Sequence, residues 1–349
     1  MPGGLDRREG LELALVTLLV VVVAVLHVAG ANDVLVFFVA AAALAALARL
    51  VGTATEQLGG RLGSGAAGVV QSALGNLPEL FVALFALHQG LTNVVQAALV
   101  GSVLANTLLV LGLAFVVGGL KNGVQTFDSS RARLTATLAA LAAATLSIPA
   151  LAHQFHAPAS HHDQALSLIC AGVLLAVFLL TLGSFLGRGT DEHEAPRWSV
   201  VATVVVLAAA AAGAVFVSDW FVDALKPAID SLHMSEEFAG LVVVAIAGNA
   251  VENVVGVQLA ARNKPDFAIS VVLNSALQVA LLLTPVLVIA SLFFATHLTL
   301  VFPMLLAIAL IMAAAIAALI TYDGESSWQE GTVLVGLYTV IVSSFWWGA

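Results

Sequence analysis

The sequence predicts an all-α integral membrane protein with about eleven transmembrane helices. Of its 349 residues, 61% are hydrophobic and only 9% are charged, whereas a soluble domain carries about 25% charged residues. Apolar runs long enough to cross a bilayer recur along the whole chain. One sequence motif also occurs twice, in segments that are predicted to cross the membrane in opposite directions. Lipid is therefore the expected solvent for most of this chain.

Each predicted transmembrane helix is an apolar run of roughly 17–25 residues, the length that spans the hydrocarbon core. The eleven runs are 11–29, 33–50, 66–88, 93–118, 134–151, 165–187, 198–217, 238–260, 266–290, 297–320 and 331–347. Several runs are longer than a straight crossing needs, which indicates tilt or interruption. The connections are short, so no soluble domain is expected.

Composition excludes several classes of function. The net charge of −9 is the wrong sign for nucleic-acid binding. The single cysteine, Cys170, cannot form a disulfide within the chain and is interpreted as a small core residue. The sequence contains no nucleophile constellation, phosphate-binding loop or zinc signature, so neither an enzyme nor a resident cofactor is expected. The run before Ala29-Gly30-Ala31 resembles a signal peptide but is longer than a typical h-region, and retention of this helix is favoured.

The basic residues predict the orientation, because Lys and Arg favour cytoplasmic loops. With a cytoplasmic N-terminus and eleven spans, only Lys226 falls outside. The other basic residues fall inside: Arg7, Arg8, Arg49, Arg61, Lys121, Arg131, Arg133, Arg188, Arg197, Arg262 and Lys264. The C-terminus is then outside, and a multi-pass protein of the cell membrane is expected.

An internal repeat organises the chain. The segment 75–112 aligns without gaps with 248–285, so that Gly75-Asn76 falls on Gly248-Asn249 and Glu79 falls on Glu252. Five spans separate equivalent helices, and an odd number inverts the second copy relative to the first. The predicted organisation is an extra N-terminal helix (1–32), a first five-helix repeat (33–187), a short acidic cytoplasmic linker (188–197) and a second five-helix repeat (198–349). Inverted repeats are typical of secondary transporters, whose ion sites lie near the midplane on broken helices.

Glu79 and Glu252 are the central candidates for ion binding. Each stands near the middle of a predicted span, where a carboxylate is costly and by default functional. Carboxylates are hard oxygen ligands suited to Ca²⁺, which takes six to eight oxygens and therefore needs further donors. Gly75, Pro78 and Gly248 are predicted to break the helices and free backbone carbonyls for that purpose.

Other polar groups could complete the ion site. The candidates are Asn76, Asn249, Ser102, Asn106, Ser275 and Gln278. Small and amide side chains also hold helices together in membranes, so packing is the alternative interpretation for each of them. For Asn76 and Asn249, satisfying freed backbone groups is favoured slightly over ligating the ion.

The same two carboxylates explain coupling to protons. Without a cation, burial and the neighbouring like charge disfavour the ionised form, so the glutamates tend to bind protons. Ca²⁺ favours the ionised form. Competition between the ion and about two protons therefore predicts exchange.

Two further groups of ionisable residues are expected to have weaker roles. Glu56, Glu236 and Glu237 lie near predicted span ends and could collect cations at the two mouths, although solvated loop charge is the simpler interpretation. The outer loop contains His153, His156, His161 and His162. It could bind a transition metal or sense external pH, but a plain polar loop is favoured.

The repeated motifs resemble those of a known family. Gly-Asn-Leu-Pro-Glu-Leu (75–80) and Gly-Ser-Val-Leu-Ala-Asn (101–106) resemble the first α-repeat of the calcium/proton exchangers. Gly-Asn-Ala-Val-Glu-Asn (248–253) and Ser-Ala-Leu-Gln-Val-Ala-Leu (275–281) resemble the second. The resemblance covers roughly residues 33–345. It implies ten or eleven spans, an acidic segment between the halves, as at 191–194, and membership of the Ca²⁺/cation antiporter superfamily.

Carried over to this chain, the resemblance makes Glu79 and Glu252 the carboxylates that bind Ca²⁺ and protons. Pro78 departs from the usual threonine, and Asn253 stands where a histidine is common. Asn274 and Ala276 replace the Gly and the second Ser of a Gly-Ser-Ser motif. These departures leave ion selectivity open.

The favoured function is antiport of Ca²⁺ for protons by alternating access. The alternative is an antiporter of the same fold that moves Na⁺ or another cation against protons. A channel needs no matched broken helices, and a scaffold would have no use for two midplane glutamates. The expected partners are Ca²⁺, H⁺ and the lipid bilayer, whereas homo-oligomerisation stays open.

Overall fold

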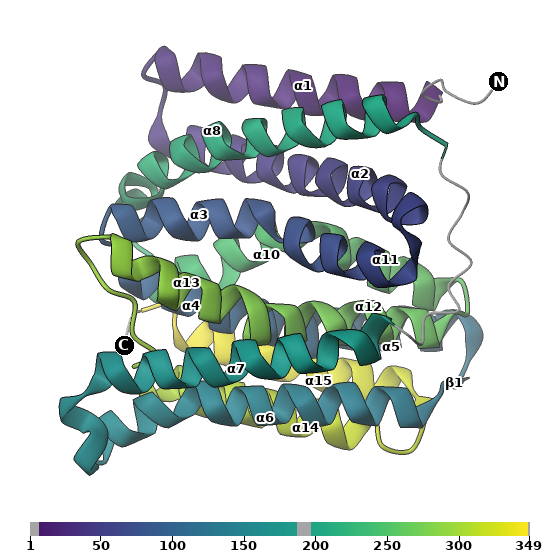
Figure 1. Cartoon of the computed structure of the whole chain (residues 1–349), viewed down its shortest axis with the longest axis vertical. Helices are drawn as coiled ribbons and strands as arrows, with labels where there is room; N and C mark the ends of the chain where they lie inside the picture. The colour runs from purple at the N-terminus through teal and green to yellow at the C-terminus, as the bar shows by residue number, and fades with distance from the viewer. Residues whose placement is uncertain (1–6, 187–196, 348–349) are drawn as a thin grey trace. The chain divides into compact units, whose positions relative to one another are not determined.

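The computed structural model describes residues 7–186 and 197–347, and the chain is helical almost throughout (Figure 1). The predicted acidic linker therefore lies outside the described residues, apart from Arg197. The elements in chain order are α1 (Arg7–Val28), α2 (Asp33–Gly75), α3 (Leu77–His88), α4 (Thr92–Leu104), η1 (Ala105–Val110), α5 (Leu111–Asn122), β1 (Gln125–Thr126), α6 (Ser129–Gln154), η2 (Pro158–His161), α7 (Asp163–Leu186), α8 (Val200–Leu232), α9 (Glu236–Phe238), η3 (Ala239–Val244), α10 (Ala245–Gly248), α11 (Ala250–Ala261), α12 (Pro265–Gln278), η4 (Val279–Leu283), α13 (Thr284–Ala290), η5 (Ser291–Phe293), α14 (Met304–Ile320), β2 (Glu325–Ser326) and α15 (Trp328–Ser344).

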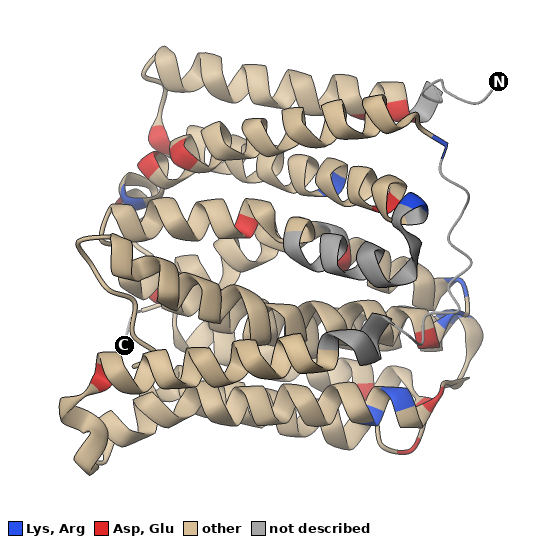
Figure 2. Ribbon diagram, viewed as in Figure 1, with Lys and Arg blue, Asp and Glu red and all other residues tan. Residues whose placement is uncertain are grey.

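Seven helices of the described chain are long and apolar enough to cross a membrane: Glu9–Val28, Asp33–Gly59, Thr92–Asn122, Ser129–Gln154, Asp163–Thr181, Val200–Leu232 and Pro265–Phe293. An eighth candidate is the bent pair Glu236–Gly248 and Glu252–Ala261, and Leu77–His88 and Met304–Ile320 are shorter apolar helices. Charged residues gather at the helix ends, and the long helices are otherwise nearly free of them (Figure 2). The all-α membrane fold is confirmed, whereas the count of eleven spans is not.

The structure differs from the predicted spans in two places. The predicted loop between 50 and 66 is helical, because α2 runs unbroken for 43 residues. This stretch contains no proline, so its polar residues lower its hydropathy without ending the helix. The predicted span 297–320 begins only at Met304, after a segment without regular secondary structure that ends at Pro303. Pro303 has no N–H to donate to an earlier turn and so disfavours an earlier start of this helix, although Pro149 and Pro227 do lie inside α6 and α8.

The chain divides into two compact units by its internal contacts. The first comprises Met1–Ala86, Phe178–His233 and Ala247–Val251, and the second comprises the remaining segments, Leu87–Val177, Met234–Ile246 and Glu252–Ala349. Each unit contains parts of both predicted repeats. The predicted boundaries of the repeats therefore describe the sequence symmetry and do not coincide with compact bodies.

In the first unit, α1, α2 and α8 pack together. Phe37 and Phe221 are fully buried and stack with their ring centroids 5.0 Å apart. Arg49 donates to Glu12 at 2.6 Å and links α2 to α1. These contacts explain how a long helix such as α2 is held to its neighbours in a medium that supplies no hydrophobic effect between helices.

In the second unit, α4 packs on η3, α5 on α15 and α6 on α14. Glycines bring these backbones close together. A Cβ at Gly331 would lie 2.4 Å from the carbonyl oxygen of Gly112, and a Cβ at Gly101 would lie 2.5 Å from that of Leu241. Small residues at helix crossings are the usual way to gain packing contacts in a bilayer.

Two segments of π-helix occur at nearly equivalent places in the repeat. They are η1 (Ala105–Val110), which includes Asn106, and η4 (Val279–Leu283), which follows Gln278; a third π-helix, η3 (Ala239–Val244), falls on part of the α-helix α2 in the repeat. The hydroxyl of Thr284 donates to the carbonyl oxygen of Val279, five residues earlier, at 2.8 Å. π-helical turns are rare and often mark functional sites.

Candidate ion-binding site

The first motif lies where two helices meet end to end. Helix α2 ends at Gly75, and the N–H of Asn76 donates to the carbonyl oxygen of Leu74. Helix α3 begins at Leu77, with Pro78 in its first turn. A proline is tolerated there because the first N–H groups of a helix have no partner within it. The break places Glu79 in the first turn of α3.

Glu79 is buried, with 7% of its surface exposed. Its Oε1 accepts a hydrogen bond of 2.6 Å from the side-chain amide of Asn249, which is itself 1% exposed. The position of Glu79 near a helix N-terminus also favours its negative charge. The sequence motif of one repeat therefore supplies the polar partner of the carboxylate in the other.

The second motif also lies at a helix break. Helix α10 ends at Gly248 and α11 begins at Ala250, and the helical segments on either side are bent by 64°. A Cβ added at Gly248 would lie only 2.3 Å from Cγ of Glu79. Gly248 thus leaves the space that the Glu79 side chain occupies.

Glu252 lies in the first turn of α11 and is half-buried. It belongs to the second compact unit, whereas Glu79, Asn76 and Asn249 belong to the first. Both glutamates therefore share the same local setting, the N-terminal turn of a helix that follows a Gly-Asn break.

A second polar cluster lies within the second unit. Ser102, Asn106 and Ser275 are all buried. The amide of Asn106 donates to Oγ of Ser275 at 3.2 Å and to the carbonyl oxygen of Ser102 at 2.9 Å. Gln278 is half-buried at the end of α12. Equivalent parts of the two repeats thus meet through hydrogen bonds, so these residues also serve helix packing.

The predicted entry residues have ordinary structural settings. Glu56 is exposed on α2. Glu236 and Glu237 are half-buried in the first turn of α9, after the N-cap Ser235. A carboxylate is favourable at that end of a helix whether or not a cation is present.

The oxygens at these two clusters belong to carboxylate, amide, hydroxyl and carbonyl groups, the donors that Ca²⁺ prefers. Over residues 7–186 and 197–347, the structure contains no group of three or more His, Cys, Asp or Glu side chains that could hold a metal ion. One pocket of about 340 Å³ lies around β1 and the turn before α12. None of the predicted ion ligands lines it.

Sequence reasoning missed two features of the site region. The π-helical turns carry no motif that hydropathy or spacing could reveal. The direct contact between Asn249 and Glu79 was also missed, since the amide was expected to bond either freed backbone or the ion. A symmetric repeat with a Gly-Asn pair before each glutamate is the signal that could have suggested it.

Comparison with known proteins identifies the family. The family model described as sodium/calcium exchanger protein matches residues 32–187 and 202–347. The Ca²⁺/H⁺ antiporter ChaA of Bacillus subtilis is 36% identical over 319 residues, covering 88% of this chain and 91% of that protein. A Ca²⁺/H⁺ antiporter of Synechocystis is 34% identical, covering 91% and 92%.

Solved structures agree with these relatives. The structure of native YfkE superposes with a TM-score of 0.83 at 31% identity, covering 96% of this chain and 99% of that one. The H⁺/Ca²⁺ exchanger CAX reaches a TM-score of 0.77 at 15% identity, which shows the fold alone. Together the fold and the comparisons define a multi-pass membrane transporter. The chain belongs to the sodium/calcium exchanger family.

The contact between Gly248 and Glu79 generates a test. The Gly248→Ala variant should lower cation-driven proton flux by about tenfold or more, because the added methyl must displace a carboxylate whose placement matters on the scale of an ångström. Flux is measured in sealed vesicles at matched protein content. Gly52→Ala is the control, since a Cβ there meets no atom within 4 Å among the described residues. Equal flux in the two variants would contradict the steric role of Gly248.

Proposed function

We propose that this protein exchanges Ca²⁺ for protons across a membrane by alternating access. The observation that carries the proposal is a buried carboxylate, Glu79, at a helix break and hydrogen-bonded by the amide of the other repeat's motif. A membrane carboxylate is retained where it works on ions or protons. The Ca²⁺/H⁺ antiport of two relatives that cover about nine-tenths of this chain supports the choice of ions.

Glu79 and Glu252 are proposed to bind either the ion or protons. In the absence of a cation, a buried carboxylate gains stability by taking up a proton. A bound Ca²⁺ replaces those protons because its charge favours the ionised form. The protein then needs no further machinery to couple the two flows, and two carboxylates imply about two protons per Ca²⁺.

Asn249 has a defined place in this cycle. Its amide holds Oε1 of Glu79 at 2.6 Å. A neutral donor can bond the carboxylate in both its charged and its protonated form, so it keeps the side chain oriented while the charge changes. Asn76, Ser102, Asn106, Ser275 and Gln278 are proposed as further oxygen donors or as packing groups around the ion path.

The proposed orientation places the N-terminus in the cytoplasm of a cell membrane. In the second unit, basic residues gather at the end that carries β1, whereas His153 in the last turn of α6, His161 in η2 and His297 in the segment before α14 lie at the opposite end of the predicted spans. The basic end would face the cytoplasm.

A reporter fused after Ala349 should therefore read as extracellular. Its activity is compared with that of the same reporter inserted in the predicted cytoplasmic loop 187–198. A cytoplasmic reading after Ala349 would contradict the proposed orientation and the odd number of spans.

A Na⁺/H⁺ antiporter is the second candidate, because the departures at Pro78 and Asn253 fall beside the two carboxylates. The two candidates differ in which ion drives proton movement. In sealed vesicles tested ion by ion, Ca²⁺ should drive the largest flux, with Mn²⁺ or Na⁺ weaker, because the site offers oxygens suited to a hard divalent cation. Proton flux that responds to Na⁺ and not to Ca²⁺ would decide for the alternative.

Replacing either carboxylate by an amide is the sharpest test of the mechanism. Glu79→Gln and Glu252→Gln should each reduce Ca²⁺/H⁺ exchange to background, because each variant loses one charge for Ca²⁺ and one exchangeable proton. Both should still insert, since a neutral amide costs less to bury than a carboxylate. Glu79→Asp and Glu252→Asp should retain part of the activity, because they keep the charge on a shorter side chain.

The exchange assay is calcium-dependent proton movement in vesicles, with insertion checked by surface labelling. Glu325→Gln, at an exposed position in β2, is the matched control and should keep normal exchange. Near-normal exchange by a well-inserted Glu79→Gln or Glu252→Gln variant would refute the shared use of the two carboxylates.

A further inference from the structure

One segment of the second unit crosses between helices without regular secondary structure. Residues 294–303, here called the strap, connect η5 to α14. Backbone groups without helical partners must find others in a membrane protein. In the strap they do so through side chains of neighbouring helices, so the strap's position depends on those side chains.

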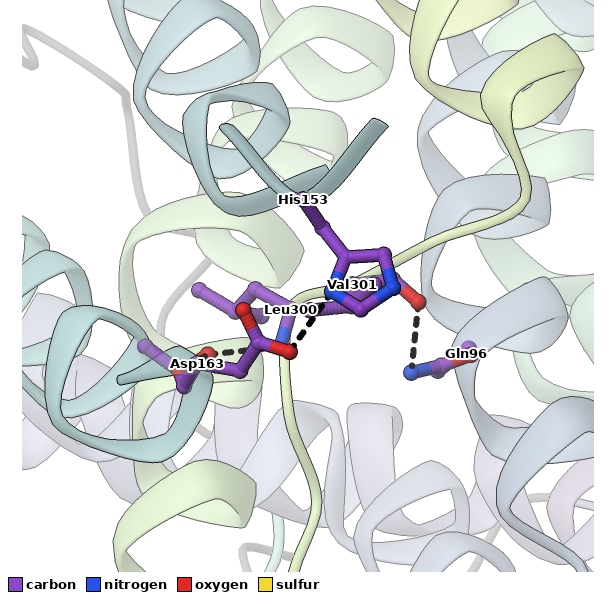
Figure 3. Close-up of polar contacts among 6 residues, drawn as sticks. Gln96, His153, Asp163, Leu300 and Val301 are labelled. Carbon is purple, nitrogen blue, oxygen red and sulfur yellow. Dashed lines mark hydrogen bonds and ion pairs between the residues drawn. The ribbon is translucent and has the colours of Figure 1, made fainter. Parts of the chain in front are cut away.

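Three helices anchor the strap. Ser167 of α7 accepts a hydrogen bond of 2.9 Å from the N–H of Leu300, and Ser291 accepts one of 2.9 Å from the N–H of Leu298. Gln96 of α4 donates to the carbonyl oxygens of Thr299 at 2.8 Å and Val301 at 3.3 Å. Figure 3 shows Gln96 meeting the strap from one side and Asp163 lying on the other.

The anchor on α7 continues to an ion pair. The hydroxyl of Ser167 donates to the backbone carbonyl oxygen of Asp163 at 2.7 Å. Oδ2 of Asp163 lies 2.8 Å from Nδ1 of His153, at the end of α6 (Figure 3). His153 thus contacts the side chain of Asp163, and the backbone carbonyl of the same residue is joined through the Ser167 hydroxyl to Leu300.

A contact between a histidine and a carboxylate is an ion pair only while the histidine is protonated. Histidine is the side chain that changes charge between about pH 5 and 8. The side chain of Asp163 is 25% exposed and its Oδ1 is buried without a hydrogen-bond partner, whereas the His153 side chain is 54% exposed. The His153 ring is thus accessible to solvent, whereas the side chain of Asp163 is mostly buried. Protonation of His153 adds a positive charge opposite a carboxylate that has few other partners.

Other ionisable groups near His153 are few. Its own connection to α7 carries His156, His161 and His162, and the strap carries His297, whose Nδ1 lies 2.8 Å from the amide of Gln164. Helix α14, which packs on α6, has no ionisable side chain, and α12, which also packs there, has only Asp266 near its first turn. Asp163 is the one carboxylate that the described structure places against His153.

We propose that His153 and Asp163 form a proton-sensitive clasp that fixes the strap and, through Gln96, the helix that carries Ser102. Acidification on the histidine side tightens the clasp, and alkalinisation loosens it. Gln96 is 7% exposed, and its helix leads directly into the polar cluster of Ser102 and Asn106. His153 is then a positioning residue that adds a proton dependence separate from that of Glu79 and Glu252. The link to exchange rests on the proposed function, whereas the clasp itself does not.

The clasp is tested by hydrogen–deuterium exchange on the full chain in detergent, without Ca²⁺. The protection factor of a peptide covering residues 294–303, corrected for the intrinsic pH dependence of amide exchange, is measured at about pH 5 and about pH 8. It should fall by about two- to fivefold on going to the higher pH, the range expected for a partly exposed ion pair. His153→Gln keeps a hydrogen-bond donor but does not titrate, so its protection should be the same at both values.

Two further variants test which contact produces the pH dependence of protection in the strap. Ser167→Ala should lower protection at both values and remove the pH dependence, because it cuts the link between Asp163 and Leu300. His161→Gln is the control and should behave as the unmodified protein does. A pH-dependent protection that persists in His153→Gln, or one absent from the unmodified protein, would overturn the clasp.

Transport separates the clasp from the proposed function. His153→Gln should retain calcium-driven proton flux, but the change of this flux with pH on the histidine side should be smaller by about twofold or more. Glu79→Gln should lose the flux altogether. Absence of calcium-driven flux in the unmodified protein would sink the proposed function and leave the exchange measurements on the strap standing. A pH profile of flux unchanged by His153→Gln would overturn the link between clasp and transport.

Discussion

The cost of burying a carboxylate in a medium without water governs the site. Glu79 meets that cost by three local devices: the N-terminal turn of α3, the amide of Asn249 at 2.6 Å and the space that Gly248 leaves. Two of these devices coincide with a helix break, since α3 begins at Leu77 and α10 ends at Gly248. The breaks and the buried carboxylate are therefore linked, because a continuous helix would not place Glu79 in an N-terminal turn.

Interrupted helices impose a related requirement in the second unit. Once helices are interrupted, backbone groups outside them need partners. Gln96, Ser167 and Ser291 supply these for the strap at 294–303. Around β1, Gln125 donates to the carbonyl oxygen of Ala260 and to Asn263, and Phe127 donates to Gly324. Polar residues that look like isolated interruptions in an apolar sequence thus satisfy identifiable backbone groups.

Much of the fold follows from the composition and from the recurrence of apolar runs along the chain, because a bilayer permits few structures. Hydropathy correctly predicted most of the helices, and Gly75 and Pro78, the predicted helix breakers, lie where α2 ends and α3 begins. Hydropathy failed between residues 50 and 66, where polar residues remain helical. It also failed at 297–303, where apolar residues lack regular secondary structure because side chains far away in the sequence, such as Gln96, bind their backbone. Gln96 and Val301 are 205 residues apart, so the sequence around either residue gives no indication of their contact.

The π-helical turns mark a second limit of sequence reasoning. A π turn inserts one residue without changing the apolar character of a helix, so η1 and η4 look like ordinary helix in sequence. The bond between Asn106 and Ser275 was equally hidden, although both residues were selected as polar groups in equivalent spans. A sequence pattern indicates which residue types are polar and which helix face they share. Which two side chains bond to each other depends on the path of the backbone.

The two repeats differ in the side chains that anchor the irregular segments between their helices. The segment around β1 and the strap occupy equivalent positions in the repeats, but their anchors are unlike. The contacts around β1 involve Gln125, Asn263 and the carboxylate of Asp266, which accepts from the N–H of Asp128 at 2.6 Å. The strap is linked through Ser167 to Asp163, whose side chain contacts His153. Under the proposed function, sequence symmetry supplies two equivalent carboxylates for ion exchange, and under the proposed clasp the unlike anchors let the two ends of the second unit respond differently to protons.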